Sequence, residues 1–408
     1  MGFVRQAQLA GARRRAGAGV TLKRVLLRGT VITPQEEIPS GSVLVEDGQV
    51  TWVGPGEPAD ATGCERLGGD DAIIAPGFVD LQVNGFAGHD AADGVEAVRQ
   101  IAARLPETGV TGFLPTIITA PLRNAARFPA VVAEAASFSA SPSGGGQGGG
   151  ARILGAHLEG PFLSPQRPGC HDATLMIEPS PENLRAILGN PPRLITLAPE
   201  LPGGLEAVRT LTRAGAIVSA GHSNATYEQG RAAVDAGVRF GTHLFNAMSP
   251  LLHRAPGLPG ALLTADEVIT GLIADGHHVH EALLSIALAR KGAGRIALTT
   301  DQVSAAGMPP GRYQLGGRDV ISDGQTVRRK EGMLAGSVGT MPQLIRIAAG
   351  LHGSSLRTAL TMASLTPARA LGLPLGRITP GAPADLVVLG DDLKVGATLV
   401  AGKIVFQS

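Results

Sequence analysis

The chain has 408 residues, with 35 Lys and Arg against 34 Asp and Glu. This balance provides no general electrostatic attraction to nucleic acid or to an anionic membrane, so we expect neither as a partner. A chain of this length is not expected to be a small binding module, and its 44% hydrophobic residues are enough to bury a large core and exclude extensive disorder.

The beginning of the chain gives no sign of secretion. Residues 1–20 contain several arginines but no apolar run of the kind a secretory signal needs, so we interpret them as a disordered basic extension or a misassigned start. Cys64 and Cys170 lie far apart and suggest neither a disulfide framework nor a thiolate metal site. No apolar run reaches the roughly 18 residues that span a bilayer. We therefore expect a cytoplasmic protein.

Short β-rich runs separated by Gly, Pro and Asp turns fill residues 21–74, a texture typical of a small antiparallel sheet. The segment from Asp385 to Phe406 has the same texture, with a predicted hairpin turn at Ala401-Gly402-Lys403. We expect residues 21–74 and 376–408 to build one small β-sandwich domain from the two chain ends.

Between these ends, short buried apolar runs alternate with longer amphipathic stretches, which is typical of βα units around a parallel sheet. The predicted strands are Val79–Val83, Gly112–Thr116, Ile153–Leu158, Leu194–Ala198, Ile217–Ala220, Arg239–Thr242, Val268–Ala274 and Ile296–Thr300. They predict an α/β protein with a (β/α)8 TIM-type barrel over residues 75–375, with its active site at the carboxyl ends of the strands. Residues 141–150 are glycine-rich and predict a flexible surface loop.

Polar residues of metal-ligating type follow several predicted strands. Glu159, His222 and His243 would provide one carboxylate and two imidazoles, a three-ligand set for a catalytic divalent ion with an open position for water. We expect Zn²⁺, with Fe²⁺ as the second choice. Such an ion lowers the pKa of bound water toward ~7 and so supplies hydroxide near neutrality.

Asp301 follows the eighth predicted strand and is the expected proton carrier. A carboxylate beside the attacking water can accept its proton and later deliver it to a leaving amine. The alternative for this residue is a structural cap in the Thr299-Thr300-Asp301 turn.

Several motifs then resemble the amidohydrolase superfamily and, more narrowly, the N-acetylglucosamine-6-phosphate deacetylase family. The superfamily resemblance lies in APGFVDLQVNG (Ala75–Gly85) and GAPADLVVL (Gly381–Leu389). The deacetylase resemblance lies in HLEGPFLSPQRPGCHD (His157–Asp172), GHSNA (Gly221–Ala225), GTHLFNAM (Gly241–Met248), ADGHHV (Ala274–Val279) and TTDQVSAAG (Thr299–Gly307). It implies a metal-dependent hydrolase that converts N-acetylglucosamine 6-phosphate to glucosamine 6-phosphate and acetate, in amino-sugar catabolism and cell-wall sugar recycling.

The resemblance also implies roles for individual residues. The metal ligands fall on Glu159, His222 and His243, in agreement with the reading from the strand ends, and the catalytic acid/base falls on Asp301. His278 matches a substrate-contacting histidine that helps to polarise the amide carbonyl. Further substrate contacts fall on Cys170, His171, Asn246, Ala247, Arg254, Leu334, Ala335 and Gly336. The resemblance implies a homodimer in which Arg254 reaches the phosphate in the neighbouring active site, whereas His277 and His280 match nothing and are expected at a helix start or on the surface.

The first strand departs from the pattern of many amidohydrolases. Gln82-Val83-Asn84 stands where they carry His-x-His, and amides are poor ligands for a borderline divalent ion. There is also no Lys between Lys23 and Lys291, which excludes relatives that use a carboxylated barrel lysine. Both observations predict one metal ion per subunit.

Two other functions stay open. The first is a mononuclear amidohydrolase that acts on another N-acyl substrate, such as an N-acyl amino acid. The second is a non-catalytic, metal-stabilised sugar-phosphate sensor, which would bind its ligand without releasing acetate.

Overall fold

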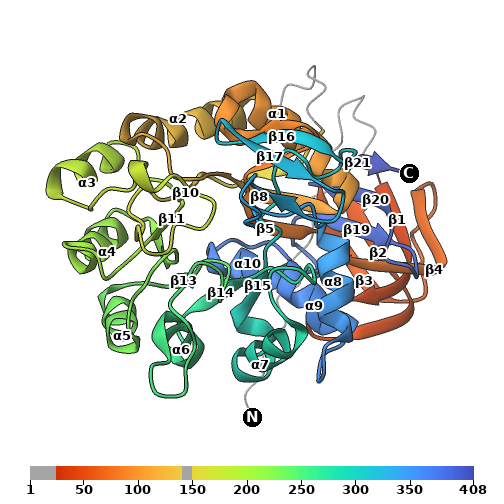
Figure 1. Ribbon diagram of the computed structural model, residues 1–408. Helices are drawn as coiled ribbons and strands as arrows, with labels where there is room; N and C mark the ends of the chain where they lie inside the picture. The colour runs from red at the N-terminus through yellow and green to blue at the C-terminus, as the bar shows by residue number, and fades with distance from the viewer. Residues whose placement is uncertain (1–23, 140–148) are drawn as a thin grey trace, which may run out of the picture.

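The computed structural model describes residues 24–139 and 149–408, which form a barrel flanked by a smaller sheet domain (Figure 1). The predicted extension at residues 1–20 and most of the predicted loop at residues 141–150 lie outside the described residues. In the described part of the chain, no helix is both long enough and apolar enough to cross a bilayer.

Eight parallel strands form the barrel, as the alternating pattern predicted. In sheet order they are β15 (Ile296–Leu298), β14 (Ile269–Leu272), β13 (Phe240–Gly241), β12 (Ile217–Ala220), β11 (Leu194–Leu197), β10 (His157–Glu159), β8 (Val110–Ile117) and β5 (Phe78–Val83). A parallel bridge between Val83 and Gln302 connects the first strand to the segment after the last, which closes the ring. The carboxyl ends of all eight strands therefore meet at one mouth.

The predicted third strand is interrupted in the structure. Instead of one strand over Ile153–Leu158, β9 (Arg152–Ile153) pairs with β8, and the chain then turns before β10 begins. Gly155 lies in the break with φ of 122°, and a Cβ at this position would come within 2.6 Å of the Arg193 Cβ. Only glycine allows this close approach and this positive φ. Because a strand residue has negative φ, the strand is interrupted at Gly155.

Helices surround the barrel and cover its strands, as Figure 1 shows for α1 to α7. They are α1 (Val95–Arg104), α2 (Leu122–Ser139), α3 (Pro181–Leu188), α4 (Gly204–Arg213), α5 (Tyr227–Ala236), α6 (Gly257–Thr264), α7 (Glu281–Lys291), α8 (Met341–Gly350), α9 (Leu356–Ala363) and α10 (Leu365–Ala370). Several of these helices begin at a Ser or Thr whose side chain caps the first turn. In α5, Thr226 and Gln229 form a reciprocal capping box.

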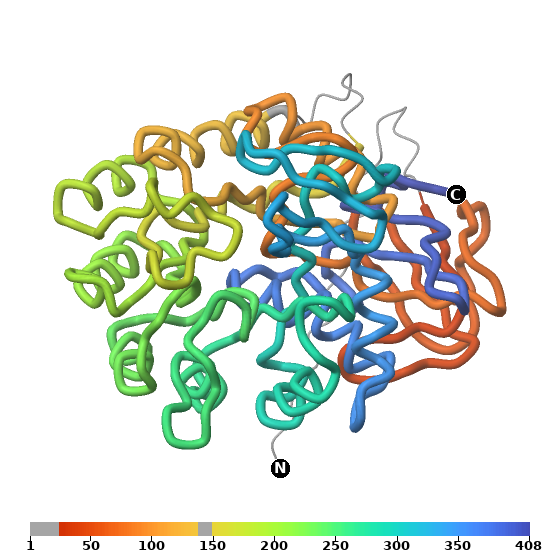
Figure 2. The backbone as a smooth tube through the Cα atoms, viewed as in Figure 1, coloured from red at the N-terminus to blue at the C-terminus, as the bar shows by residue number. Residues whose placement is uncertain are grey.

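Both chain ends build the second domain, and Figure 2 shows their traces running together beside the barrel. Its strands are β1 (Arg24–Ile32), β2 (Glu37–Glu46), β3 (Gln49–Pro55), β4 (Glu65–Pro76), β19 (Leu386–Leu389), β20 (Val395–Val400) and β21 (Lys403–Gln407), in the order β21-β20-β19-β4-β1-β2-β3. The predicted turn at Ala401-Gly402 joins β20 to β21. The sheet is antiparallel as predicted except in one pairing, because β1 and β4 run parallel.

The seven-stranded sheet of the second domain packs around one apolar core, which takes side chains from β1, β2, β3, β4, β19 and β20. Main-chain hydrogen bonds from Val50 to Ala382 and from Gly402 to Ala384 draw its distant parts together. Arg152 of the barrel binds the buried carboxylate of Asp385 through two hydrogen bonds of 2.7 and 3.0 Å. The predicted fold class is confirmed, and the residue boundaries proposed for the two domains stay a prediction.

A small three-stranded sheet at the barrel mouth was not predicted. It comprises β16 (Gly311–Leu315), β17 (Arg318–Ser322) and β18 (Val327–Arg328). The Gly316-Gly317 turn between the first two strands has positive φ at both residues, 56° and 76°, as a tight hairpin turn requires. The apolar faces of this sheet pack over Ile118 and Val303 beside the candidate site.

Candidate functional site

A cavity of about 210 Å³ opens at the mouth of the barrel. It brings together all but two of the predicted site residues: Glu159, Cys170, His171, His222, His243, Asn246, Ala247, His278, Asp301, Leu334 and Gly336. They come from the ends of several different strands and the loops that follow them, so the convergence depends on the barrel and not on proximity in sequence.

The three predicted metal ligands converge most closely. Nε2 of His243 lies 2.8 Å from Oε1 of Glu159, and Nε2 of His222 lies 3.2 Å from the same oxygen. One potential ligand atom from each residue lies within 4.8 Å of the others, and all three residues are buried. Among the described residues, this is the group of His, Cys, Asp and Glu side chains with the geometry to hold a metal ion.

The protonation pattern of this cluster suits a cation. Nδ1 of His222 lies 3.0 Å from the carbonyl oxygen of Arg167, which can only accept, so this nitrogen carries the proton and Nε2 presents a lone pair to Glu159. Nδ1 of His243 is buried without a partner. The lone pair of His222 and the carboxylate of Glu159 repel each other, whereas a divalent ion between them would bind both, together with Nε2 of His243. The donor set therefore fits a divalent metal ion of the type bound by nitrogen and oxygen.

His171 holds the second oxygen of the Glu159 carboxylate. Its Nδ1 accepts a hydrogen bond from the main-chain N–H of Thr119 at 3.2 Å, so Nε2 carries the proton and faces Oε2 of Glu159 at 3.3 Å. Burial alone would raise the pKa of Glu159, but the contacts with His171, His222 and His243 hold that pKa well below its usual range. Glu159 therefore remains an anion at neutral pH.

The backbone is strained at the site. His222, His243 and Asp301 each lie two or three residues beyond the end of a barrel strand and have φ of 47°, 29° and 52°. Residues other than glycine rarely adopt this left-handed region, and doing so costs on the order of 1–3 kcal/mol each. The barrel core thus holds three chemically important residues in conformations that the chain would otherwise avoid.

Asp301 lies beside this cluster and is almost completely buried. Its Oδ1 accepts a hydrogen bond of 2.7 Å from Nδ2 of Asn84, and Oδ1 of Asn84 has no partner. Burial is the main cause that raises the pKa of Asp301, and repulsion from Glu159 raises it further. A carboxyl whose charged form is destabilised in this way is suited to accept and return a proton. Asn84 was predicted only to be a poor metal ligand, and its contact with Asp301 was not foreseen.

His278 is oriented by an aspartate that the sequence analysis did not single out. Nδ1 of His278 lies 2.7 Å from Oδ2 of Asp275, while Oδ1 of Asp275 accepts hydrogen bonds from the main-chain N–H groups of His277 and His278. Burial would raise the pKa of Asp275, but the side-chain hydrogen bond with His278, its charge and the N–H groups of His278 and His277 together outweigh burial and lower that pKa. The carboxylate fixes the proton on Nδ1 and leaves Nε2 as the nitrogen available to a ligand. The Asp-Gly-His-His run was the only signal for this pair.

Two predicted substrate contacts lie outside the cavity. Ala335 is fully buried next to it, and its N–H donates to the carbonyl of Val327. Arg254 lies exposed in the loop between β13 and α6 and does not line the cavity of its own chain. Of the two histidines expected elsewhere, His280 caps α7 through its ring nitrogen and His277 is exposed, as predicted.

Comparisons with known proteins agree with this geometry. A profile described as "Amidohydrolase family" matches residues 73–405. An N-acetylglucosamine-6-phosphate deacetylase of Lysinibacillus sphaericus is 34% identical, over 95% of this chain and 99% of the relative. An N-acetylgalactosamine-6-phosphate deacetylase of Escherichia coli O157:H7 is 36% identical, over 94% of this chain and 99% of the relative. A solved structure of a mutant N-acetyl-D-glucosamine-6-phosphate deacetylase from Mycobacterium smegmatis, in complex with N-acetyl-D-glucosamine-6-phosphate, is 36% identical. It has a TM-score of 0.85 and the match covers 94% of this chain and all of that one.

Proposed function

The chain belongs to the amidohydrolase family, and from that premise we propose that it hydrolyses N-acetylglucosamine 6-phosphate to glucosamine 6-phosphate and acetate. The observation that carries the proposal is the convergence of Glu159, His222 and His243 on one point beside Asp301. A buried set of one carboxylate and two imidazoles with a neighbouring proton carrier is suited to amide hydrolysis. The relatives named as deacetylases of this substrate support the choice of substrate.

We propose that each subunit holds a single divalent ion, with Zn²⁺ preferred over Fe²⁺. Glu159, His222 and His243 would hold it, and Zn²⁺ readily accepts this mixture of nitrogen and oxygen ligands. Asn84, from the strand that carries ligands in many relatives, is already engaged with Asp301 and offers only an amide oxygen. When bound, the ion supplies Lewis acidity toward water and toward the amide carbonyl.

The side chains of this chain then divide the work of proton transfer. Asp301 accepts a proton from the attacking water and returns it to the nitrogen as the C–N bond breaks. Asn84 fixes one oxygen of Asp301 and leaves the other free for this transfer. His278, aligned by Asp275, stabilises the negative charge that develops on the carbonyl oxygen when its Nε2 is protonated.

The sugar phosphate is assigned to the remaining wall of the cavity. Asn246, Ala247, Leu334 and Gly336 line it together with Cys170 and His171, while Ala335 supports it from behind. These contacts carry no positive charge for the phosphate. We assign this role to Arg254 of the neighbouring subunit in a homodimer, because the guanidinium binds phosphate with two parallel hydrogen bonds. A cytoplasmic location agrees with a phosphorylated sugar substrate.

An acetate-release assay with zinc-loaded protein tests the proposal. N-acetylglucosamine 6-phosphate should be hydrolysed and its unphosphorylated form much more slowly. Asp301→Asn should keep zinc and substrate binding but lose turnover by at least roughly a hundredfold. Binding without acetate release would instead indicate a sensor, and preference for an N-acyl amino acid would indicate another amidohydrolase activity.

A second candidate substrate is N-acetylgalactosamine 6-phosphate, because a relative named for that substrate is 36% identical over nearly its whole length. The two sugars differ only in the configuration at C4. Parallel measurement of kcat/KM for both decides between them.

A further inference from the structure

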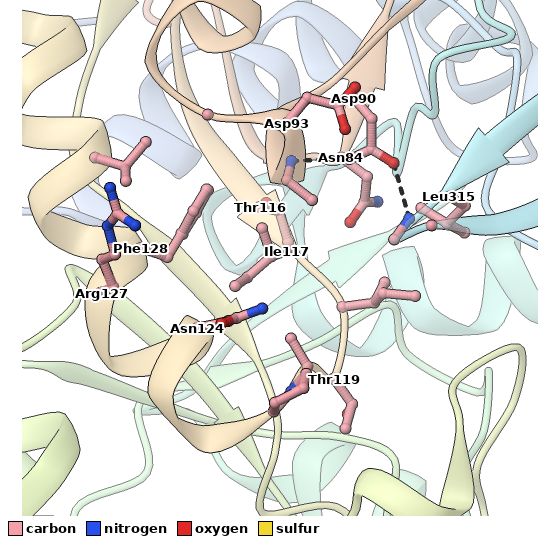
Figure 3. Close-up of a pocket in the computed structure, with 18 of the residues that line it drawn as sticks. Asn84, Asp90, Asp93, Thr116, Ile117, Thr119, Asn124, Arg127, Phe128 and Leu315 are labelled. Carbon is pink, nitrogen blue, oxygen red and sulfur yellow. Dashed lines mark hydrogen bonds between the residues drawn. The ribbon is translucent and has the colours of Figure 1, made fainter.

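A second and larger cavity, of about 640 Å³, adjoins the candidate site (Figure 3). It lies between the carboxyl ends of β5 and β8, the segment before α1, the start of α2 and the Gly316-Gly317 turn. None of the metal-ligating residues lines it. Asn84, Ile118 and Leu315 line both cavities and form the boundary between them.

The order of the barrel strands sets the direction in which this cavity lies. β8, which leads into Ile118, is four places from β13, which leads into the proposed sugar contacts Asn246 and Ala247. In a ring of eight strands these positions are on opposite sides of the mouth. A substrate whose sugar contacts Asn246 and whose carbonyl lies at Glu159 and Asp301 therefore directs its acyl group toward the boundary.

The boundary has the chemistry of an acyl-binding wall. The side chains of Ile118 and Leu315 are buried and aliphatic, and they pack with each other in one apolar cluster. Between the two cavities, Asn84 is only 2% exposed and its Oδ1 lacks a hydrogen-bond partner. A short aliphatic chain would contact the first two side chains, and a hydroxyl on that chain would satisfy the amide oxygen.

A second sugar phosphate fits this cavity less well. Its lining includes two carboxylates, Asp90 and Asp93, whereas Arg127 is its one cationic lining residue among those described. Figure 3 shows Arg127 on α2, away from Asn84 and Leu315. A dianionic phosphate would therefore meet at least as much negative as positive charge.

We propose that this second cavity receives the acyl chains of N-acyl amino-sugar phosphates whose acyl group is longer than acetyl. The inference rests on the proposed function, since it extends the same hydrolysis to larger acyl groups. Water forms the new C–O bond, the C–N bond breaks, and one proton of the water passes through Asp301 to the amine. The products are a propionate, butyrate or glycolate and the amino-sugar phosphate.

The test compares N-acetyl, N-propionyl, N-butyryl and N-glycolyl glucosamine 6-phosphate as substrates of the zinc-loaded full chain. We expect kcat/KM for the N-propionyl and N-glycolyl compounds within about tenfold of the N-acetyl value. Asn124→Phe and Val131→Phe place bulk inside the cavity from α2, and each should lower the ratio of N-butyryl to N-acetyl kcat/KM at least fivefold. Ile118→Ala widens the boundary and should raise that ratio.

Arg123→Phe is the matched control, because Arg123 is exposed on the same helix but does not line the cavity. It should leave the ratio unchanged. An unchanged ratio in both filling variants would overturn the proposal. So would a higher KM for every substrate in Arg127→Gln, since that result would place the phosphate in this cavity. Absence of activity on the N-acetyl compound itself would instead refute the proposed function, so the two failures can be distinguished.

Discussion

Asn84 and Asp301 join the first strand of the barrel to the segment after the last through a buried hydrogen bond of 2.7 Å from Nδ2 to Oδ1. The bond occupies one carboxylate oxygen and so determines which oxygen faces the reacting groups. An amide thus stands where a metal ligand stands in many relatives, and it acts on the proton carrier instead.

Replacement of Asn84 by Ala should lower kcat about 10- to 100-fold with little change in KM, because small displacements of a catalytic group cost rate more than binding. Steady-state kinetics with N-acetylglucosamine 6-phosphate measures this split. Asn84→Ser, which retains a hydroxyl donor, should recover part of the loss. Full kcat in the Ala variant would show that Asp301 is held without the amide.

The Asp275 and His278 pair should behave as one unit in a double-mutant cycle. Asp275→Asn should lower kcat/KM about tenfold in the otherwise unchanged enzyme, since the imidazole loses its orienting carboxylate. In a His278→Ala background the same substitution should change kcat/KM by less than about twofold. Equal effects in both backgrounds would mean that Asp275 acts only on the local fold.

Metal loading should be visible as stability, independently of activity. A ligand that binds only the folded state adds about 2.7 kcal/mol to the free energy of unfolding when its free concentration is 100 times its Kd. Adding zinc to chelator-treated protein should therefore raise Tm, and Glu159→Gln should remove most of that increase. His277→Ala is the control, because this exposed histidine lies outside the cavity. An identical Tm increase in the Glu159→Gln protein would place the ion elsewhere.

Combining two impaired variants in one dimer tests whether Arg254 acts on the neighbouring active site. Arg254→Ala should raise KM for the phosphorylated substrate and leave the slow hydrolysis of the unphosphorylated one unchanged. A dimer of one Arg254→Ala subunit and one Asp301→Asn subunit contains one site with both Asp301 and Arg254. Coexpressed hybrids should thus recover up to half of the activity at low substrate concentration. No recovery in purified hybrids would place Arg254 in its own site or in neither.

Asp90 should make stability depend on pH. Burial raises the pKa of Asp90 to about 6 despite hydrogen bonds from the N–H groups of Ala92 and Gly316. Between the ordinary value of 3.8 and about 6, the folded state binds more protons than the unfolded state, so this group adds stability as pH falls through 6.

Denaturant unfolding of the wild type and Asp90→Asn at pH 7.5 and pH 5 measures this effect. The wild type should gain about 1–2 kcal/mol relative to the variant at the lower pH. The Asn variant controls for every other titrating group. A constant difference between the two proteins would show that Asp90 does not change its protonation on unfolding.

The barrel was predictable because its strands are buried on both faces and therefore appear as short, mainly apolar runs. The observed β12 (Ile217–Ala220) has the predicted bounds, and most others differ by one or two residues at an end. Pairing direction was not predictable, since the alternation of β1 and β4 is the same whether the strands run parallel or antiparallel. The Gly316-Gly317 pair between β16 and β17 is also a hairpin signal that can be seen in the sequence.

Some features of the candidate site could likewise be predicted from the sequence, and others could not. Ligand-type residues that end strands could be read from the sequence, because parallel strands bring their carboxyl ends to one place. The orienting partners could not, because contacts such as that of His171 with Glu159 depend on how the connecting loops fold back. Arg254 matched a family motif in the sequence but lies outside the cavity of its own chain, because the loop between β13 and α6 turns it to the surface.

The sheet shared by the two chain ends also has a consequence for synthesis on the ribosome. β4 pairs with β1 on one side, but its other edge pairs with β19, which emerges only after the whole barrel has been made. Until then a nascent chain carries an open strand edge at Ile73, Ile74, Ala75 and Pro76, which invites association with other chains. Pairing of β19 with β4 covers this edge once the final residues have been made. A chain truncated before β19 would contain the whole barrel sequence but should aggregate.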